Sequence, residues 1–332
     1  MHKPILINIG QGHTVKELLE LHIGETLLRP DSIKSYRSAA NVFIQYCGNG
    51  GDDIYLTDIT KELTLQWRQK VLDTHAPTSW NSYRTRMCSL FNHGVAAGWI
   101  EQNPLRHVKT TRVGRRPKRT ISYDQRKIIV DFIEKIPDYP SPGQTGHIAF
   151  MPGWFWLALF KTLYFTGMRR RQLVNLRWKD INFNTGVMRL SLDGSKTNQE
   201  WSIPILPTLD EQLQIVYGKT LEITNATEVD LMNRQVFAIG LFNPKYHATN
   251  SLGEIYEDQI SGFFGRLSRK LGFRITAHGM RHTFATELMR APNPDIKAIQ
   301  ELLGHSHIRM TLQYMETNMQ QLRRSTNSLP SL

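Results

Sequence analysis

The chain has 332 residues, more than one compact domain usually holds, so we expect two domains. Its 41 lysine and arginine residues against 29 aspartate and glutamate residues give a formal net charge of +12, which favours a polyanionic partner, nucleic acid ahead of an anionic membrane. No run approaches the roughly 18 apolar residues that span a bilayer, no signal-peptide pattern opens the chain, and Cys47 and Cys88 are too few for a disulfide framework. We therefore expect a cytoplasmic protein without membrane contact.

The first hundred residues show helical periodicity. A capping box at residues 14–17 opens the first helix, and apolar residues at helical spacing continue through a second helix, residues 33–47. A third helix is predicted around residues 63–71 and a fourth around residues 80–91, whose other faces carry Arg84 and Arg86. We predict that residues 1–106 form a helical bundle.

A strongly basic segment follows this bundle. Residues 106–119 read RHVKTTRVGRRPKR, with seven basic residues in fourteen and no acidic one. We interpret residues 107–119 as an interdomain linker. The run is typical either of a solvated connector or localisation signal, or of a strap that lies along DNA phosphates.

Residues 120–332 are predicted to form a second, mainly helical domain. Helices are indicated at residues 124–134, 154–165, 209–216, 259–271, 278–289, 294–303 and 308–315. The β-prone runs 187–192 and 201–206 predict a hairpin with Lys196 at its polar tip. The expected fold class is mainly α, with an N-terminal helical bundle and a mixed α+β domain that contains a small antiparallel sheet. The pattern assigns no role to residues 137–152 and 218–252.

Four short clusters carry side chains that could perform chemistry. They are Thr166-Gly-Met-Arg169, the hairpin residue Lys196, His278-Gly-Met-Arg281, and Leu303-Gly-His305 with Tyr314 nine residues further on. Taken singly, each is more simply explained as surface charge or packing. Their occurrence together, in this order and at these spacings, indicates a shared function.

These clusters resemble the motifs of tyrosine recombinases, the phage-integrase and Xer-type family. TGMRRRQLVNLRWKD at 166–180 and HGMRHTFAT at 278–286 are similar to the two arginine boxes of the family, and LLGHSHIRMTLQY at 302–314 carries its spacing from histidine to nucleophilic tyrosine. The resemblance covers about residues 120–316. The first hundred residues resemble the helical core-binding domain of the family more loosely. Gln172 departs from the pattern, because the family usually has an acidic residue there.

The resemblance implies a site-specific recombinase that attacks a DNA phosphate with Tyr314. Guanidinium groups bind nonbridging phosphate oxygens in a planar, bidentate manner, which suits the family role of Arg169 and Arg281. A phenol with an ordinary pKa of about 10 is a poor nucleophile without cations or a base nearby. The family role of general base falls on His278, and that of phosphate hydrogen-bond donor on His305.

Lys196 would protonate the departing 5′ oxygen, and the intermediate would be a 3′-phosphotyrosine. The resemblance implies no metal, no nucleotide and no other cofactor, since the covalent bond conserves the energy of the phosphodiester. It also implies a specific site on double-stranded DNA, a homotetramer on two duplexes and exchange through a Holliday junction, and it leaves open whether accessory factors set direction.

Several basic residues outside the catalytic set are candidates for DNA contact. Most DNA-binding energy comes from phosphates, so cations on exposed segments are the expected contacts. Surface charge without a ligand is the alternative interpretation of each. The candidates are Arg84, Arg86, Lys109, Arg112, Arg115, Arg116, Lys118, Arg119, Arg170 and Arg171.

Three other functions fit parts of the pattern. A zinc hydrolase is suggested by His278 and His282, four residues apart on one helix, but position 279 is glycine where the HExxH motif requires glutamate, and Arg281 would lie beside the cation. A catalytically silent DNA-binding protein of the same fold would not need the complete residue set. A type IB topoisomerase shares the tyrosine and arginine chemistry but acts on a single duplex.

Overall fold

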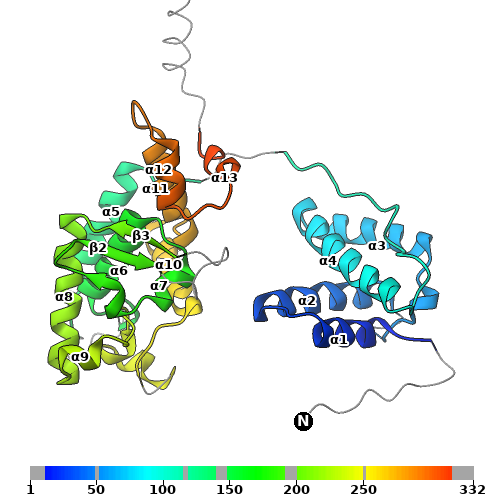
Figure 1. Cartoon of the computed structure of the whole chain (residues 1–332), viewed down its shortest axis with the longest axis horizontal. Helices are drawn as coiled ribbons and strands as arrows, with labels where there is room; N and C mark the ends of the chain where they lie inside the picture. Colours follow the sequence, from blue (N-terminus) through cyan, green and yellow to red (C-terminus); the bar gives the residue numbers. More distant parts are fainter. Residues whose placement is uncertain are drawn as a thin grey trace, which may run out of the picture. The chain divides into compact units, whose positions relative to one another are not determined.

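The computed structural model describes residues 12–48, 52–114, 119–139, 148–190, 200–249 and 252–315. The chain divides into two compact units, Met1–Arg116 and Pro117–Leu332 (Figure 1). Both are mainly helical, and the second contains a small antiparallel sheet, so the expected fold class is confirmed. Within the described residues, no helix is both long enough and apolar enough to cross a membrane.

The first unit is a bundle of the helices predicted from sequence. They are α1 (Val15–Glu25), α2 (Pro30–Cys47), α3 (Lys61–Thr74) and α4 (Pro77–Ala96), with a short 3-10 helix at Leu56–Asp58. Thr14 opens α1 with the expected capping box, in which its hydroxyl accepts from the backbone of Glu17. Fully buried aromatic side chains fill the centre, with the ring of Trp67 edge-on to those of Phe43 and Trp80.

The basic segment begins as part of this unit. Asn81 on α4 donates from Nδ2 to the carbonyl of Thr111 (2.9 Å) and accepts from the amide of Thr111 (2.8 Å). Arg84 donates from Nε to the carbonyl of Val108 (2.8 Å), and Trp80 donates from Nε1 to the carbonyl of Lys109 (3.3 Å). Residues 108–111 are therefore held along α4 by hydrogen bonds between side chains of α4 and main-chain atoms of the segment.

The second unit contains the helices expected from sequence, together with several short elements that the sequence pattern did not predict. In chain order it comprises α5 (Tyr123–Glu134), α6 (Gly153–Thr166), α7 (Arg170–Asn175), β1 (Ile181–Asn182), β2 (Val187–Leu190), β3 (Trp201–Pro204), α8 (Pro207–Thr224), α9 (Glu228–Leu231), α10 (Glu257–Leu271), α11 (Ala277–Met289), α12 (Ile296–Leu302) and α13 (Ile308–Leu312). Short 3-10 helices lie at Ile148–Phe150, Trp178–Asp180, Ile239–Leu241 and Pro244–Thr249.

Helix α6 lies at the centre of this unit. It is apolar on nearly every face, as expected for a helix that is packed on all sides, and α5, α8 and α11 pack against it. Trp156 of α6 stacks on Phe263 of α10, with ring centroids 4.0 Å apart. Gly167 ends α6 in the left-handed conformation, with φ of +59°, which directs the chain into the segment that carries Arg169.

The sheet has the order β1-β2-β3 and is antiparallel throughout. Strands β2 and β3 form the predicted hairpin, with Met188 opposite Ile203. Its tip, residues 191–199 with Lys196, lies outside the described residues. Trp201 of β3 donates from Nε1 to the carbonyl of Leu302 (3.2 Å), which attaches the sheet to the end of α12.

Candidate active site

Three segments of the second unit carry the candidate catalytic residues. Arg169 precedes α7; His278, Arg281 and His282 lie on α11; His305 lies between α12 and α13, and Tyr314 follows α13. Helices α11, α12 and α13 gather at one end of the unit in Figure 1, and each packs on the next. The structure thus brings five of the six predicted catalytic residues to one end of the unit.

Arg281 ties the three segments together. Its side chain is only 3% exposed. Nη1 donates to the carbonyl of Gly167 (2.7 Å), and Nη2 donates to the carbonyl of Leu303 (2.6 Å) and lies 3.1 Å from Nε2 of His305. Burial, followed by the charge of Arg169, lowers the pKa of Arg281 to about 10, so the group stays a cation at neutral pH.

His305 is buried between Arg281 and α13. Its Nδ1 lies 2.9 Å from the hydroxyl of Thr311. A guanidinium has donors only, so Nε2 of His305 must accept from Arg281, which we infer leaves the ring proton on Nδ1. The ring lies parallel to that of Tyr314, with centroids 6.1 Å apart. In this geometry His305 fixes the orientation of Arg281.

Arg169 has unused hydrogen-bonding capacity. Its Nη1 is buried without a hydrogen-bond partner among the described residues. Burial lowers the pKa of Arg169, and the nearby Tyr314 opposes that shift. An unpaired buried donor costs about 1–3 kcal/mol, which an oxyanion bound at this point would relieve.

Gln172, the departure from the family pattern, supports Arg169 through the main chain. Its side chain is 3% exposed, and its Oε1 accepts from the backbone amide of Arg169 at 2.8 Å. A neutral amide supplies this acceptor as well as a carboxylate does, but without a negative charge. The residue therefore keeps the local backbone geometry without adding a negative charge beside the two arginines.

Tyr314 is buried in the pocket formed by its own chain. The side chain is 5% exposed, and its hydroxyl lies 3.1 Å from Nδ1 of His282. Burial raises the pKa of Tyr314, while Arg281 and then Arg169 oppose this shift. The phenol is consequently neutral at neutral pH and needs a proton acceptor before it can attack.

The structure also brings His282, which was not among the predicted catalytic residues, to 3.1 Å from the hydroxyl of Tyr314. His278, the expected base, has an exposed side chain, and its ring packs edge-on against that of His282, with centroids 4.1 Å apart. His282 had been considered only as half of a zinc pair. The sequence signal that could have identified it is its spacing of four residues from His278, which places both rings on one face of α11. In the described part of the chain, no three His, Cys, Asp or Glu side chains converge on a possible metal position.

The predicted DNA contacts fall into three groups. Arg84 is engaged with main-chain carbonyls, Arg86 lies over the ring of Tyr36 (5.7 Å), and Arg170 forms an ion pair with Glu257 (2.8 Å). Exposed cations are Lys109, Arg112 and Arg119, and Arg171 is half-buried. Arg115, Arg116 and Lys118 lie outside the described residues.

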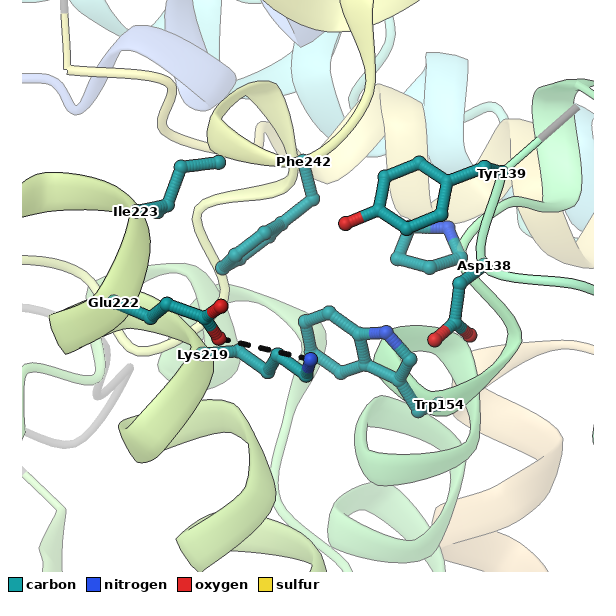
Figure 2. Close-up of a pocket in the computed structure, with 8 residues that line it drawn as sticks. Asp138, Tyr139, Trp154, Lys219, Glu222, Ile223 and Phe242 are labelled. Carbon is teal, nitrogen blue, oxygen red and sulfur yellow. Dashed lines mark ion pairs between the residues drawn. The ribbon is translucent and has the colours of Figure 1, made fainter.

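A separate hollow of about 240 Å³ contains none of the catalytic candidates (Figure 2). Trp154, Phe242, Tyr139 and Ile223 give it apolar walls, and its other lining residues are Asp138, Pro152, Lys219 and Glu222. The last two form an ion pair at 3.7 Å. The segments 137–152 and 218–252, which the sequence pattern left unexplained, supply all of this lining except Trp154.

The fold and the site together define a class of protein. A tyrosine hydroxyl beside two guanidinium groups and two imidazoles, at one end of a mainly helical unit, is a site that can hold a phosphate group against a phenol. Residues 153–321 match the model of the phage integrase family, and residues 15–111 match that of the phage integrase SAM-like domain. The chain belongs to the phage integrase family, as its motifs indicated.

Named relatives agree with this assignment. A tyrosine recombinase XerC of Pseudomonas syringae is 32% identical over 321 residues, which cover 95% of this chain and 64% of the relative. A relative of the same name from Pseudomonas aeruginosa is 29% identical, over 93% of this chain and 70% of its own length. The chain thus spans only about two thirds of the length of these curated relatives.

Solved structures show the same fold. The Tn1549 transposon integrase in complex with a circular intermediate DNA has a TM-score of 0.71 and 20% identity, and the match covers 95% of this chain and 99% of that one. A lambda integrase dimer bound to a COC′ core site has a TM-score of 0.67 and 20% identity, over 95% and 81% of the two chains.

Proposed function

We propose that this chain is a site-specific DNA recombinase that cleaves and rejoins DNA strands through Tyr314. The observation that carries the proposal is the position of the Tyr314 hydroxyl, buried beside Arg281, Arg169 and His282 of its own chain. Family membership and relatives named as tyrosine recombinases support it.

In the proposed reaction, Arg169 and Arg281 bind the nonbridging oxygens of the scissile phosphate. Arg281 is fixed by main-chain carbonyls, and Arg169 brings a buried donor that lacks a partner among the described residues. Each preorganised donor of this kind contributes roughly 10² to 10³ in rate, because it meets charge that develops only in the transition state.

The Tyr314 oxygen then attacks phosphorus, and the bond to the 5′ oxygen breaks. The leaving oxygen takes a proton from Lys196, a role carried over from the family pattern, and the product is a 3′-phosphotyrosine. A 5′ hydroxyl of another strand reverses the step and reseals the backbone. The energy of the phosphodiester is retained throughout, so the scheme uses neither ATP nor a metal ion.

We further propose that cleavage occurs in cis. Tyr314 packs on His282 and His305 of its own chain, so the nucleophile and the phosphate-binding arginines belong to one protomer. A homotetramer on two DNA duplexes is the proposed assembly, by analogy with the solved lambda integrase tetramer bound to a Holliday junction, which shares 18% identity. We place its action in the cytoplasm, on the nucleoid when DNA is bound.

The proposed activity can be tested without knowing the target site. Wild type and Tyr314→Phe are expressed in bacterial cells, denatured with detergent and captured, and any DNA that remains attached is sequenced. We expect DNA only with wild type, and its sequence identifies the site. Equal recovery from both proteins would exclude Tyr314 as the nucleophile. Absence of attached DNA from both, even with nicked duplexes that trap the intermediate, would leave a non-catalytic DNA-binding protein.

A further inference from the structure

Trp201 of β3 contacts the α12 turn, residues 302–305, which joins the end of α12 to the segment before α13. Nε1 of Trp201 donates to the carbonyl of Leu302 at 3.2 Å. The indole ring lies so close to Gly304 that a Cβ built there would collide with it. Gly304 has a φ of +57°, a left-handed conformation that glycine adopts without strain. The turn thus supplies both the acceptor and the space for the indole.

The α12 turn also holds two candidate catalytic residues. The carbonyl of Leu303 accepts from Nη2 of Arg281 at 2.6 Å, and His305 ends the turn. Leu303 lies between the two residues that Trp201 contacts. A displacement of the indole would therefore move the carbonyl that fixes Arg281 and the backbone that carries His305.

The sheet gives Trp201 a firm base. In the pairing of β3 with β2, Trp201 lies opposite Leu190, and Ile203 lies opposite Met188. Leu190, Met188 and Ile203 are at most 1% exposed, and β3 packs against α12. Because the interior of a protein is closely packed, the position of the sheet is transmitted through the indole to the turn.

We infer that Trp201 is a positioning residue for strand cleavage, an inference that rests on the proposed function. It acts through the α12 turn, which it holds where the guanidinium of Arg281 can meet the nonbridging oxygens of the phosphate. Bidentate binding of phosphate depends on the orientation of the guanidinium, and a misplacement of about 1 Å can cost about 10² in rate. Trp201 lies outside the four motif clusters, so the motifs do not indicate this role.

The α12 turn has hydrogen bonds of its own, which limit what the loss of the indole can do. Nε2 of Gln300 donates to the carbonyl of His305 at 2.9 Å, and the amide of His305 donates to the carbonyl of Gln300 at 3.0 Å. Nδ1 of His305 lies 2.9 Å from the hydroxyl of Thr311. We therefore expect substitution of Trp201 to displace the turn without unfolding it.

The test is single-turnover cleavage by the full chain on a nicked duplex that carries the site recovered with wild type, at a temperature at which circular dichroism shows each variant folded. Trp201→Leu removes the N–H donor and most of the ring. It should form covalent complex at least about tenfold more slowly than wild type. Its DNA affinity, measured by fluorescence anisotropy, should stay within about threefold of the wild-type value, because the proposed role lies in orientation after binding.

Two variants calibrate this loss. Trp201→Phe keeps an aromatic ring but has no N–H donor, so its cleavage rate should lie between those of wild type and Trp201→Leu. The matched control, Ser202→Ala, changes the exposed next residue of β3, which points to the opposite face of the sheet. Ser202→Ala should cleave like wild type.

A double-mutant cycle separates positioning from a general loss of stability. Lysine at position 281 keeps the charge but lacks the planar fork that joins the turn to the phosphate. In the Arg281→Lys background, Trp201→Leu should therefore slow cleavage by less than about threefold, because the group through which it acts is already gone. A merely weakened fold should cost the same factor in both backgrounds.

Each outcome has a definite meaning. If wild type forms no Tyr314-linked DNA on this duplex, the proposed function fails. If wild type reacts and Trp201→Leu reacts within about threefold of it, or loses the same factor in both backgrounds, only the role of Trp201 is wrong. A loss of DNA affinity with an unchanged cleavage rate at saturating protein would assign Trp201 to DNA binding and would also overturn the inference.

Discussion

Substitutions of the two active-site arginines should both abolish cleavage but should differ in their effect on stability. Arg281 donates to the carbonyls of Gly167 and Leu303, whereas Nη1 of Arg169 has no partner among the described residues. Arg281→Ala should therefore destabilise the second unit and also abolish cleavage. Arg169→Ala should abolish cleavage with little effect on stability.

The magnitude follows from the contacts. A hydrogen bond from a charged donor contributes about 1.5–3 kcal/mol, so the two carbonyl bonds of Arg281 amount to about 3–6 kcal/mol. The cost of burying its charge, visible in its lowered pKa, offsets part of this, and we expect a net loss of about 2–4 kcal/mol in the free energy of unfolding. For a unit of this size that corresponds to a fall in Tm of about 5–15 °C. Arg281→Lys keeps the charge but cannot reach both carbonyls, so its Tm should be intermediate.

Thermal unfolding followed by circular dichroism gives the stability, and single-turnover cleavage of the captured site gives the rate. Each alanine variant should lose at least about 10² in rate. The reasoning would be refuted if Arg281→Ala melted at the wild-type temperature, or if the two alanine variants lost equal stability.

Three further outcomes are expected. Mixing Tyr314→Phe with Arg169→Ala should restore no cleavage, because in cis both residues must belong to one protomer; recovery of cleavage would show that the tyrosine acts in trans. Gln172→Leu should lower the free energy of unfolding by about 1–3 kcal/mol in chemical denaturation, because the backbone amide of Arg169 loses its acceptor. The free energy of unfolding of Gln172→Glu should lie within about 1 kcal/mol of the wild-type value. Equal losses in the two variants would contradict the backbone role of Gln172. Gly304→Ala should lower the free energy of unfolding by roughly 1–3 kcal/mol and Tm by several degrees. Gly304 has a φ of +57°, and a Cβ there would collide with the ring of Trp201. An unchanged Tm would contradict this strain.

Local pattern was sufficient for most of the fold. The capping box at Thr14, the apolar run of α6 and the alternation around Met188 each depend on neighbours in sequence, and each produced the predicted element. Strand β1 was missed because two residues carry too little pattern, and it is defined only by pairing with β2.

The active site could be predicted only as far as its motifs. Motif spacing identified four residues that the structure places together: Arg169, Arg281, His305 and Tyr314. The contact of His282 with Tyr314 joins two segments that no local pattern relates. It depends on how the chain after α13 folds back on α11, which is a property of packing.

Because residues 108–111 are attached to α4 through main-chain atoms, the path of this part of the basic segment does not depend on the charge of its side chains. Asn81, Arg84 and Trp80 bind main-chain atoms, so they fix the route of the chain whichever side chains it carries. The exposed positions Lys109 and Arg112 can then change without altering that route. Electrostatic affinity for a polyanion could be tuned there by simple substitution, while the scaffold that presents those side chains stays the same.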